Sequence, residues 1–227
     1  MNYNCAGIIV AAGSGTRMGG VSKPNIKILG VTLFEYVLKA FCQSMADDIV
    51  VVCSKDNIES LKEIAAGYNK EVSFVLGGST RAESVFNGIT AANADIACVH
   101  DCARPFITAC LIDQTIKTAA EKGASCLCSP ITDTVKHKDP QTGIVSTPNR
   151  DNMFAVQTPQ CFKTEHYLNA KAAAGESYRS FTDETSLLEA AGVEVEYIKT
   201  ACTNIKLTTV DDIPIAEILM KRALNND

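Results

Sequence analysis

Short apolar segments alternate with helix-like segments along the first 130 residues of the chain. The apolar segments, each long enough for one strand, cover residues 6–11, 49–53, 72–76, 96–100 and 124–130. Between them, apolar residues recur at helical spacing, as in the sets Leu33, Phe34, Val37, Leu38, Phe41 and Ala82, Val85, Phe86, Ile89. Strands that alternate with helices are typical of a parallel sheet. We therefore expect an α/β fold with a mostly parallel, twisted sheet flanked by helices.

The alternation is interrupted after Pro130. Residues 133–150 contain two short extended stretches on either side of a turn-like Asp-Pro-Gln-Thr-Gly sequence, which predicts a two-stranded β-arm. A hairpin is only marginally stable alone, so the arm packs either on a second copy of the chain or as a flap on its own sheet. Helical patterns return at 164–173 and 182–191, followed by a strand at 193–199 and a helix from about Asp211. We expect one domain over residues 1–227, with the β-arm projecting from it.

The first apolar segment runs directly into a glycine-rich turn and two cations, in the sequence IIVAAGSGTRMGGVSK from Ile8 to Lys23. The turn contains residues with small side chains or none: Ala11, Ala12, Gly13, Ser14 and Gly15. Such residues let backbone N–H groups close on phosphate oxygens, and glycine permits the positive φ that the turn needs. A plain strand-to-helix turn would explain the glycines equally well, but it would not require Arg17 and Lys23. The two cations therefore favour a triphosphate-binding loop.

Two better known phosphate-binding motifs do not fit this loop. A dinucleotide fingerprint requires a third glycine where Met18 stands. A P-loop requires Gly-Lys-Ser/Thr at the end of the turn, whereas Gly20 is followed by Val21 and Ser22. Neither a dehydrogenase nor a P-loop enzyme is therefore indicated.

Two further predicted strands are followed by residues suited to a ligand. Gly77-Gly78-Ser79-Thr80-Arg81 brings small residues, hydroxyls and a cation to the end of the third strand, and Asp101 follows the fourth. Ligands of open α/β sheets bind at the carboxyl ends of strands, so these segments and the first loop should share one crevice. Mg²⁺ needs one or two carboxylates besides phosphate and water, which makes Asp101 a candidate ligand. The alternatives are a helix cap at Ser79 or Thr80 and an ion pair between Asp101 and Arg104.

Polar motifs in the second half of the chain are individually weak. They share hydroxyl and cationic side chains: Asp133-Thr134-Val135-Lys136, Asn149-Arg150-Asp151, Gln157-Thr158-Pro159-Gln160, Thr182-Asp183-Glu184 and Asn204-Ile205-Lys206. Each could be an ordinary helix cap or surface cation. Together they suit a phosphorylated polyol.

Composition narrows the class of protein. The formal charge of −5 argues against a nucleic-acid partner, which would select a basic excess or stripe. No apolar run approaches the length of about 18 residues that a membrane span needs, and no basic segment precedes the first apolar run, as a secretory signal would require. The ten cysteines are scattered through apolar runs without a Cys-x-x-Cys pair, which indicates buried thiols rather than disulfides or zinc ligands. We expect a cytoplasmic protein with no nucleic-acid or membrane partner.

The ordered set of motifs resembles one family, the 2-C-methyl-D-erythritol 4-phosphate cytidylyltransferases of the non-mevalonate isoprenoid pathway. The resemblance covers nearly the whole chain and rests on AAGSGTRM, the lysine of SKP, GGSTRAESV, HDCARPF, SPITDTVK, NRDNMFAVQTPQCF, FTDETSLLEAAG and TNIKLTTVDDI. It implies a Rossmann-like nucleotidyltransferase fold. It also implies that CTP and 2-C-methyl-D-erythritol 4-phosphate are joined to give 4-diphosphocytidyl-2-C-methyl-D-erythritol and pyrophosphate. The alternatives are a ribitol-5-phosphate (pentitol phosphate) cytidylyltransferase, which differs mainly in the acceptor pocket, and a non-catalytic nucleotide sensor.

The resemblance implies roles for residues at matching positions. The catalytic cations are Arg17, Lys23, Arg150 and Lys206. The nucleotide is surrounded by Ala11, Ala12, Gly13, Ser14, Gly15, Gly78, Ser79, Arg81 and Ser84. The sugar-alcohol phosphate is contacted by Arg104, Thr134, Arg150, Thr158, Thr182 and Lys206. Asp101 is the Mg²⁺ ligand, and Thr134 reaches from the arm into the partner subunit's site, which favours a homodimer over the flap.

Two features depart from the family pattern. Proline follows Lys23, whereas many relatives place a proline before the lysine, and this leaves Lys27 as an alternative. We assign the role to Lys23, because the run from Ile28 to Gly30 then keeps its register with the family. Cys102 replaces a commonly small residue and could make the site sensitive to thiol reagents.

Overall fold

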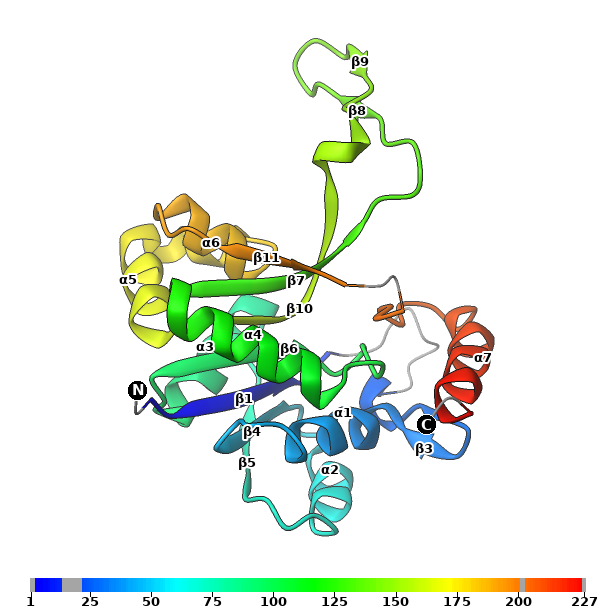
Figure 1. Ribbon diagram of the computed structural model, residues 1–227. Helices are drawn as coiled ribbons and strands as arrows, with labels where there is room; N and C mark the ends of the chain where they lie inside the picture. The colour runs from blue at the N-terminus through cyan, green and yellow to red at the C-terminus, as the bar shows by residue number, and fades with distance from the viewer. Residues whose placement is uncertain (1–2, 14–21, 201–202, 226–227) are drawn as a thin grey trace.

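A seven-stranded sheet forms the centre of the molecule (Figure 1). The computed structural model describes residues 3–13, 22–200 and 203–225. The strands of this sheet are β1 Cys5–Val10, β4 Asp48–Cys53, β5 Val72–Leu76, β6 Ile96–Asp101, β7 Ala124–Pro130, β10 Phe154–Lys163 and β11 Glu196–Lys199. They lie in the order β11-β7-β10-β6-β1-β4-β5. β10 is antiparallel to both of its neighbours, and the other pairs are parallel, which confirms the predicted α/β class with a mostly parallel sheet.

Helices cover both faces of the sheet, and short elements connect them. The helices are α1 Leu33–Cys42, α2 Ile58–Ala65, α3 Arg81–Ala92, α4 Ala109–Lys122, α5 Thr164–Ala174, α6 Glu184–Ala190 and α7 Asp212–Leu224. The described residues also form the short 3₁₀ helices η2 Lys23–Asn25, η3 Arg150–Asn152 and η4 Gly175–Ser180, and β2 Lys27–Ile28 pairs with β3 Val31–Thr32. In the described ranges, no helix has both the length and the apolar character needed to cross a membrane.

Each central strand contributes to two hydrophobic cores, because consecutive side chains of a strand point to opposite faces. Ile9 belongs to the core that includes Phe41 of α1 and residues of α2 and α4. Its neighbour Ile8 belongs to the core that includes Val85 of α3 and residues of α5 and α6. A smaller cluster packs α7 through Met220 against β2 and the start of α1. The apolar stripes noted in the sequence are therefore core residues.

Helix α3 begins immediately after the Gly77-Gly78 turn. The hydroxyl of Thr80 accepts a hydrogen bond from the backbone N–H of Glu83 at 3.1 Å, which satisfies one of the free N–H groups of the first helical turn. Further along, a Cβ added to Gly88 would lie 2.6 Å from Cγ2 of Ile8 and 2.7 Å from Cγ2 of Val52. The glycine therefore lets α3 approach the sheet closely, and the helix start is held beside the carboxyl ends of β1 and β4.

The sequence did not predict β10. Its alternation is broken by the polar residues of Gln157-Thr158-Pro159-Gln160, and a proline in a run usually argues against a central strand. In the structure, the pairing of β10 with β7 shifts register between Val156 and Gln160, which accommodates the proline. Two other expected bounds also change: α6 occupies 184–190 rather than 182–191, and β11 begins at Glu196 rather than at residue 193.

The predicted β-arm projects from the sheet (Figure 1). The chain leaves at the end of β7, and strands β8 His137–Lys138 and β9 Val145–Ser146 pair antiparallel near the tip. Ile144 is 67% exposed and Val145 58% exposed, so the tip carries uncovered apolar side chains. The arm does not lie as a flap on its own sheet, which removes that alternative.

Candidate functional site

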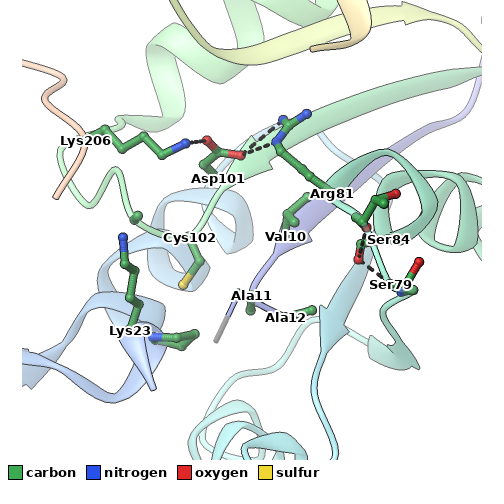
Figure 2. A pocket seen from close by; sticks show the side chains of 15 residues that line it. Val10, Ala11, Ala12, Lys23, Ser79, Arg81, Ser84, Asp101, Cys102 and Lys206 are labelled. Atoms are coloured by element: carbon green, nitrogen blue, oxygen red, sulfur yellow. Dashed lines mark hydrogen bonds and ion pairs between the residues drawn. The ribbon is translucent and has the colours of Figure 1, made fainter. Parts of the chain in front are cut away.

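A cavity of about 490 Å³ lies at the carboxyl ends of β1 and β6 and beside the start of α3 (Figure 2). This is the edge of an open α/β sheet at which ligands bind. The predicted site residues that line it are Ala11, Ala12, Gly13, Lys23, Gly78, Ser79, Arg81, Ser84, Asp101 and Lys206. Residues from distant parts of the sequence therefore meet in one crevice, as the motif positions predicted.

Small residues let the first two loops approach each other. A Cβ added to Gly77 would lie 2.6 Å from Cβ of Ala12 and 2.8 Å from Oγ of Ser84. The backbone N–H of Gly78 donates to Oγ of Ser84 at 3.1 Å, which fixes the turn against the first residues of α3. The neighbouring Ser79 N–H donates to the Glu83 carboxylate at 2.7 Å. Both loops consequently present backbone to the cavity with little side-chain cover.

Four charged side chains form a connected network at one wall of the cavity. Arg81 donates from Nε and Nη2 to Oδ1 of Asp101, at 3.2 and 3.1 Å. It also donates from Nη1 and Nη2 to the two carboxylate oxygens of Glu184, at 2.7 and 3.0 Å. Lys206 donates from Nζ to Oδ2 of Asp101 at 2.6 Å (Figure 2). The two cations and two carboxylates leave this group formally neutral.

The network controls the charge states of its acids. Burial raises the pKa of Asp101, but the attraction of Arg81 and Lys206 is stronger and holds that pKa well below its usual range. Asp101 is therefore ionised at any ordinary pH. Burial also raises the pKa of Glu184, and the nearby Arg81 opposes this effect only in part. Asp101 thus lines the cavity as a largely buried carboxylate that keeps its charge.

Lys23 approaches the cavity from the opposite side. It is the first residue of η2, and its Nζ donates to the backbone carbonyl of Leu207 at 3.2 Å. Leu207 N–H in turn donates to the carbonyl of Ala103 at 2.9 Å, just after β6. Lys27, the alternative to Lys23, is exposed in β2 and does not line the cavity. The geometry therefore favours Lys23.

A buried chain of hydrogen bonds holds the backbone of Asp101 on the side away from the cavity. Its backbone N–H donates to Oγ1 of Thr158 at 3.1 Å, and that hydroxyl lies 3.0 Å from Nδ1 of His100. The carbonyl of Arg104 can only accept, so Nε2 of His100 carries a proton and donates to it at 3.1 Å. In the neutral imidazole Nδ1 is then an acceptor, and the hydroxyl of Thr158 donates to it. Burial lowers the pKa of His100 to about 4, so the imidazole is neutral.

Several predicted site residues lie away from the cavity wall. Thr158 is 4% exposed and lies behind Asp101, while Arg104 donates from Nη1 to the carbonyl of Asn204 at 2.8 Å. Thr182 is exposed just before α6. Thr134 and Arg150 are exposed on the arm, where Nη1 of Arg150 donates to the Thr132 carbonyl at 2.9 Å. Ser14, Gly15 and Arg17 lie outside the described residues.

Sequence reasoning missed two polar residues that support the site. Glu184 was grouped with an ordinary helix cap, yet it is 3% exposed and paired with Arg81. Asn57 was not singled out, yet it is fully buried and contacts the residues at both ends of the first loop. An acid or amide at a helix start is usually a cap, so no local pattern separated these two residues from many similar ones.

The fold and the cavity define a nucleotide-binding α/β protein. Backbone-lined loops, two lysines and an ionised carboxylate at the carboxyl edge of a parallel sheet suit a phosphate chain with its counterion.

The comparisons with known proteins specify the family. The model of the family "IspD: 2-C-methyl-D-erythritol 4-phosphate cytidylyltransferase" matches residues 5–222. A relative of that name from Clostridium novyi is 38% identical over 97% of this chain and 98% of its own length. One from Clostridium botulinum is 36% identical over 95% and 96%. A solved 4-diphosphocytidyl-2C-methyl-D-erythritol synthase from Anaerococcus prevotii superposes with a TM-score of 0.86 at 31% identity, covering 97% of each chain. The chain belongs to the 2-C-methyl-D-erythritol 4-phosphate cytidylyltransferase family, and it is a nucleotidyltransferase.

Proposed function

We propose that this chain joins CTP and 2-C-methyl-D-erythritol 4-phosphate at the cavity described above, giving 4-diphosphocytidyl-2-C-methyl-D-erythritol and pyrophosphate. The observation that carries the proposal is the convergence of Lys23, Lys206 and Asp101 on a cavity bordered by two backbone-lined loops. The matched family and the quoted relatives carry the methylerythritol name, so a pentitol phosphate as acceptor is not favoured.

The reaction needs no nucleophilic side chain. An oxygen of the acceptor's phosphate forms a bond to the α-phosphorus of CTP, and the bond from that phosphorus to the bridging oxygen of the β-phosphate breaks, so pyrophosphate leaves. The protein's contribution is to align the two phosphates and to stabilise the added negative charge. Lys23 and Arg17 are proposed to hold the triphosphate. Lys206 is proposed to direct the attacking phosphate, and Arg104 and Thr182 are proposed to contact the polyol. Thr158, expected to contact the polyol as well, is buried behind Asp101 with its hydroxyl engaged, so we propose that it supports that carboxylate instead.

Asp101 is the residue proposed to hold Mg²⁺. In the described part of the chain, no group of three or more acids, histidines or thiols could form a metal site from protein ligands alone. Mg²⁺ does not require one, since phosphate oxygens and water supply most of its ligands. Asp101 fits this demand because it is ionised and lines the cavity. Its Oδ1 accepts two hydrogen bonds from Arg81, whereas Oδ2 accepts one from Lys206 and retains a lone pair for a metal ion. Bound to the triphosphate, Mg²⁺ would neutralise charge on the leaving pyrophosphate.

We propose that the active form is a homodimer in which each arm completes the other subunit's site. Thr134 and Arg150 lie on an arm that extends away from the cavity of their own chain (Figure 1), which supports a role in a second copy. The exposed Ile144 and Val145 at its tip would then be covered on association. In this proposal residues 1–227 act as one nucleotidyltransferase domain, with the arm at about 133–150.

We place the reaction in the cytoplasm. The cysteines of the described residues are free thiols, as expected in a reducing compartment.

The proposal is tested by measuring pyrophosphate release. Each of the four nucleoside triphosphates is offered with methylerythritol phosphate and Mg²⁺, and CTP is also offered with ribitol 5-phosphate. We expect release with CTP and methylerythritol phosphate to exceed that of every other pair. Faster turnover of ribitol phosphate would transfer the protein to the pentitol class, and the absence of release with either acceptor would indicate a nucleotide sensor.

A further inference from the structure

Asn57 contacts both ends of the chain segment that follows β1. Its Nδ2 donates to the backbone carbonyl of Ala11 at 3.0 Å and to Oγ of Ser22 at 3.1 Å. Its Oδ1 accepts from the backbone N–H of Ser54 at 2.9 Å. The side chain is fully buried, so water does not compete for these bonds. One amide group therefore connects the end of β1, the residue before η2 and the loop after β4.

The side-chain hydrogen bonds of Asn57 are not helix-capping bonds. Asn57 is the N-cap residue of α2, and its side chain makes no capping hydrogen bond to that helix. Asparagine is favoured at this position because of such a bond. Here the amide is instead turned toward Ala11, which lines the cavity, and toward Ser22, the neighbour of Lys23.

A second contact with the start of α2 holds η2 at Asn25, on the C-terminal side of Lys23. Nδ2 of Asn25 donates to Oγ of Ser60 at 3.1 Å, and that hydroxyl donates to the carbonyl of Asn57 at 2.9 Å. η2 is therefore attached to α2 at the residue before Lys23 and again two residues after it. The backbone of Lys23 is consequently fixed relative to a buried part of the fold, while its side chain extends to the cavity (Figure 2).

We propose that Asn57 is a positioning residue of the nucleotide site. Its amide nitrogen donates hydrogen bonds to both Ala11 and Ser22, and these bonds fix the position of Lys23 relative to Ala11. The proposal rests on the assignment of the cavity to CTP. It adds a residue that does not line the cavity and acts on the ligand through two neighbours. A displacement of about 1 Å at a positioned group can cost on the order of 10²-fold in rate.

The decisive variant is Asn57→Asp, which keeps the acceptor for Ser54 N–H and replaces the donating NH₂ by an oxygen. That oxygen is repelled by the Ala11 carbonyl, so the contact to β1 is lost. We expect kcat/KM for CTP to fall by roughly 10- to 100-fold, while KM for methylerythritol phosphate at saturating CTP changes by less than about threefold. Asn4→Asp is the matched control, since it makes the same change just before the other end of β1, and it should leave both constants unchanged.

A second variant separates positioning from folding. Ser22→Ala removes one hydrogen-bond partner of the Asn57 amide. It should also lower kcat/KM for CTP, through a higher KM. The double variant should be no worse than Asn57→Asp alone, because both act through one contact. The melting temperature is recorded for every variant. If Asn57→Asp lowers the melting temperature but leaves kcat/KM for CTP at the wild-type value, the residue is merely structural and the proposal is wrong. Failure of the wild-type protein to release pyrophosphate would instead refute the proposed function, so the two failures are distinguishable.

Discussion

Four charged residues at the cavity, Arg81, Lys206, Asp101 and Glu184, form ion pairs with one another. Asp101 accepts hydrogen bonds from Arg81 on one oxygen and from Lys206 on the other, and Glu184 pairs with the opposite edge of Arg81. A charge that is paired in this way avoids much of the cost of burial. A nucleotide with its metal ion would exchange these partners for new ones rather than enter a site of uncompensated charge.

Lys23 is the single residue on which the account depends most. Lys23→Ala should lower kcat for pyrophosphate release by about 10²- to 10³-fold, the usual scale for the loss of one preorganised donor. Lys27→Ala is the matched control, because Lys27 is exposed in β2 and should be dispensable. If the Lys27 variant is impaired and the Lys23 variant turns over normally, the two lysines have been assigned in the wrong order.

His100 makes stability depend on pH. Its pKa in the folded protein is about 4, lower than the ordinary value of 6.5, because burial disfavours the imidazolium. The folded state therefore binds this proton less readily than the unfolded state. Its contribution to stability is complete above pH 6.5 and is lost as the pH falls toward 4, by up to about 3 kcal/mol. Urea unfolding measured across this range should show the decline. His100→Gln should flatten it and His137→Gln should not, and equal slopes for all three proteins would contradict the assignment.

At the residue scale, the sequence predicted cavity residues where they adjoin a strand end. Gly78 and Asp101 could be predicted because sheet topology alone brings strand ends together. Lys23 could be predicted because it is one of the two cations that follow the glycine-rich turn after β1. Glu184 and Asn57 could not, since their partners lie 103 and 46 residues away and both stand at ordinary helix starts. Polar contacts at such separations depend on helix placement, which periodicity does not specify.

At the scale of elements, the close approach of α3 to the sheet depends on one glycine. Gly88→Ala places a methyl group against Ile8 and Val52. Both side chains are fully buried, so their displacement costs free energy. We expect a loss of roughly 1 to 3 kcal/mol in unfolding free energy from overpacking, which exceeds the gain in helix propensity of about 1 kcal/mol. Gly67→Ala, whose nearest contact would be an ordinary 3.5 Å, should change stability little. Urea denaturation decides the matter, and a Gly88 variant as stable as the wild type would contradict this packing argument.

The elements also show where sequence patterns fail. The parallel strands were predictable because each is a short apolar run between helical segments. β10 was not, because it combines a buried strand with polar residues and a proline. One of these polar residues, Thr158, accepts a hydrogen bond from the backbone N–H of Asp101. The polar sequence that made β10 unpredictable therefore supports the site. The arm was predicted from its turn sequence as a projecting element, and the structure shows it extending from the sheet.

At the scale of the whole molecule, the proposed homodimer predicts that two inactive variants restore each other. A chain with Lys23→Ala keeps an intact arm, and a chain with Arg150→Ala keeps an intact cavity. In a mixed dimer one site then has both residues. Random exchange of subunits should yield about a quarter of wild-type activity, because half of the dimers are mixed and each has one complete site.

Pyrophosphate release before and after subunit exchange checks this prediction, with each variant alone as the baseline. Activity of the mixture that stays at the sum of the separate variants would show that Arg150 does not act in a partner's site.

A crystal structure of the protein with CTP and Mg²⁺ would test the central claim most directly. The account predicts the triphosphate in the cavity, with a phosphate oxygen about 3 Å from Nζ of Lys23 and the base beside Gly78 and Ser79. A structure in which CTP binds elsewhere, or in which Lys23 and Lys206 lie far from every phosphate, would contradict it.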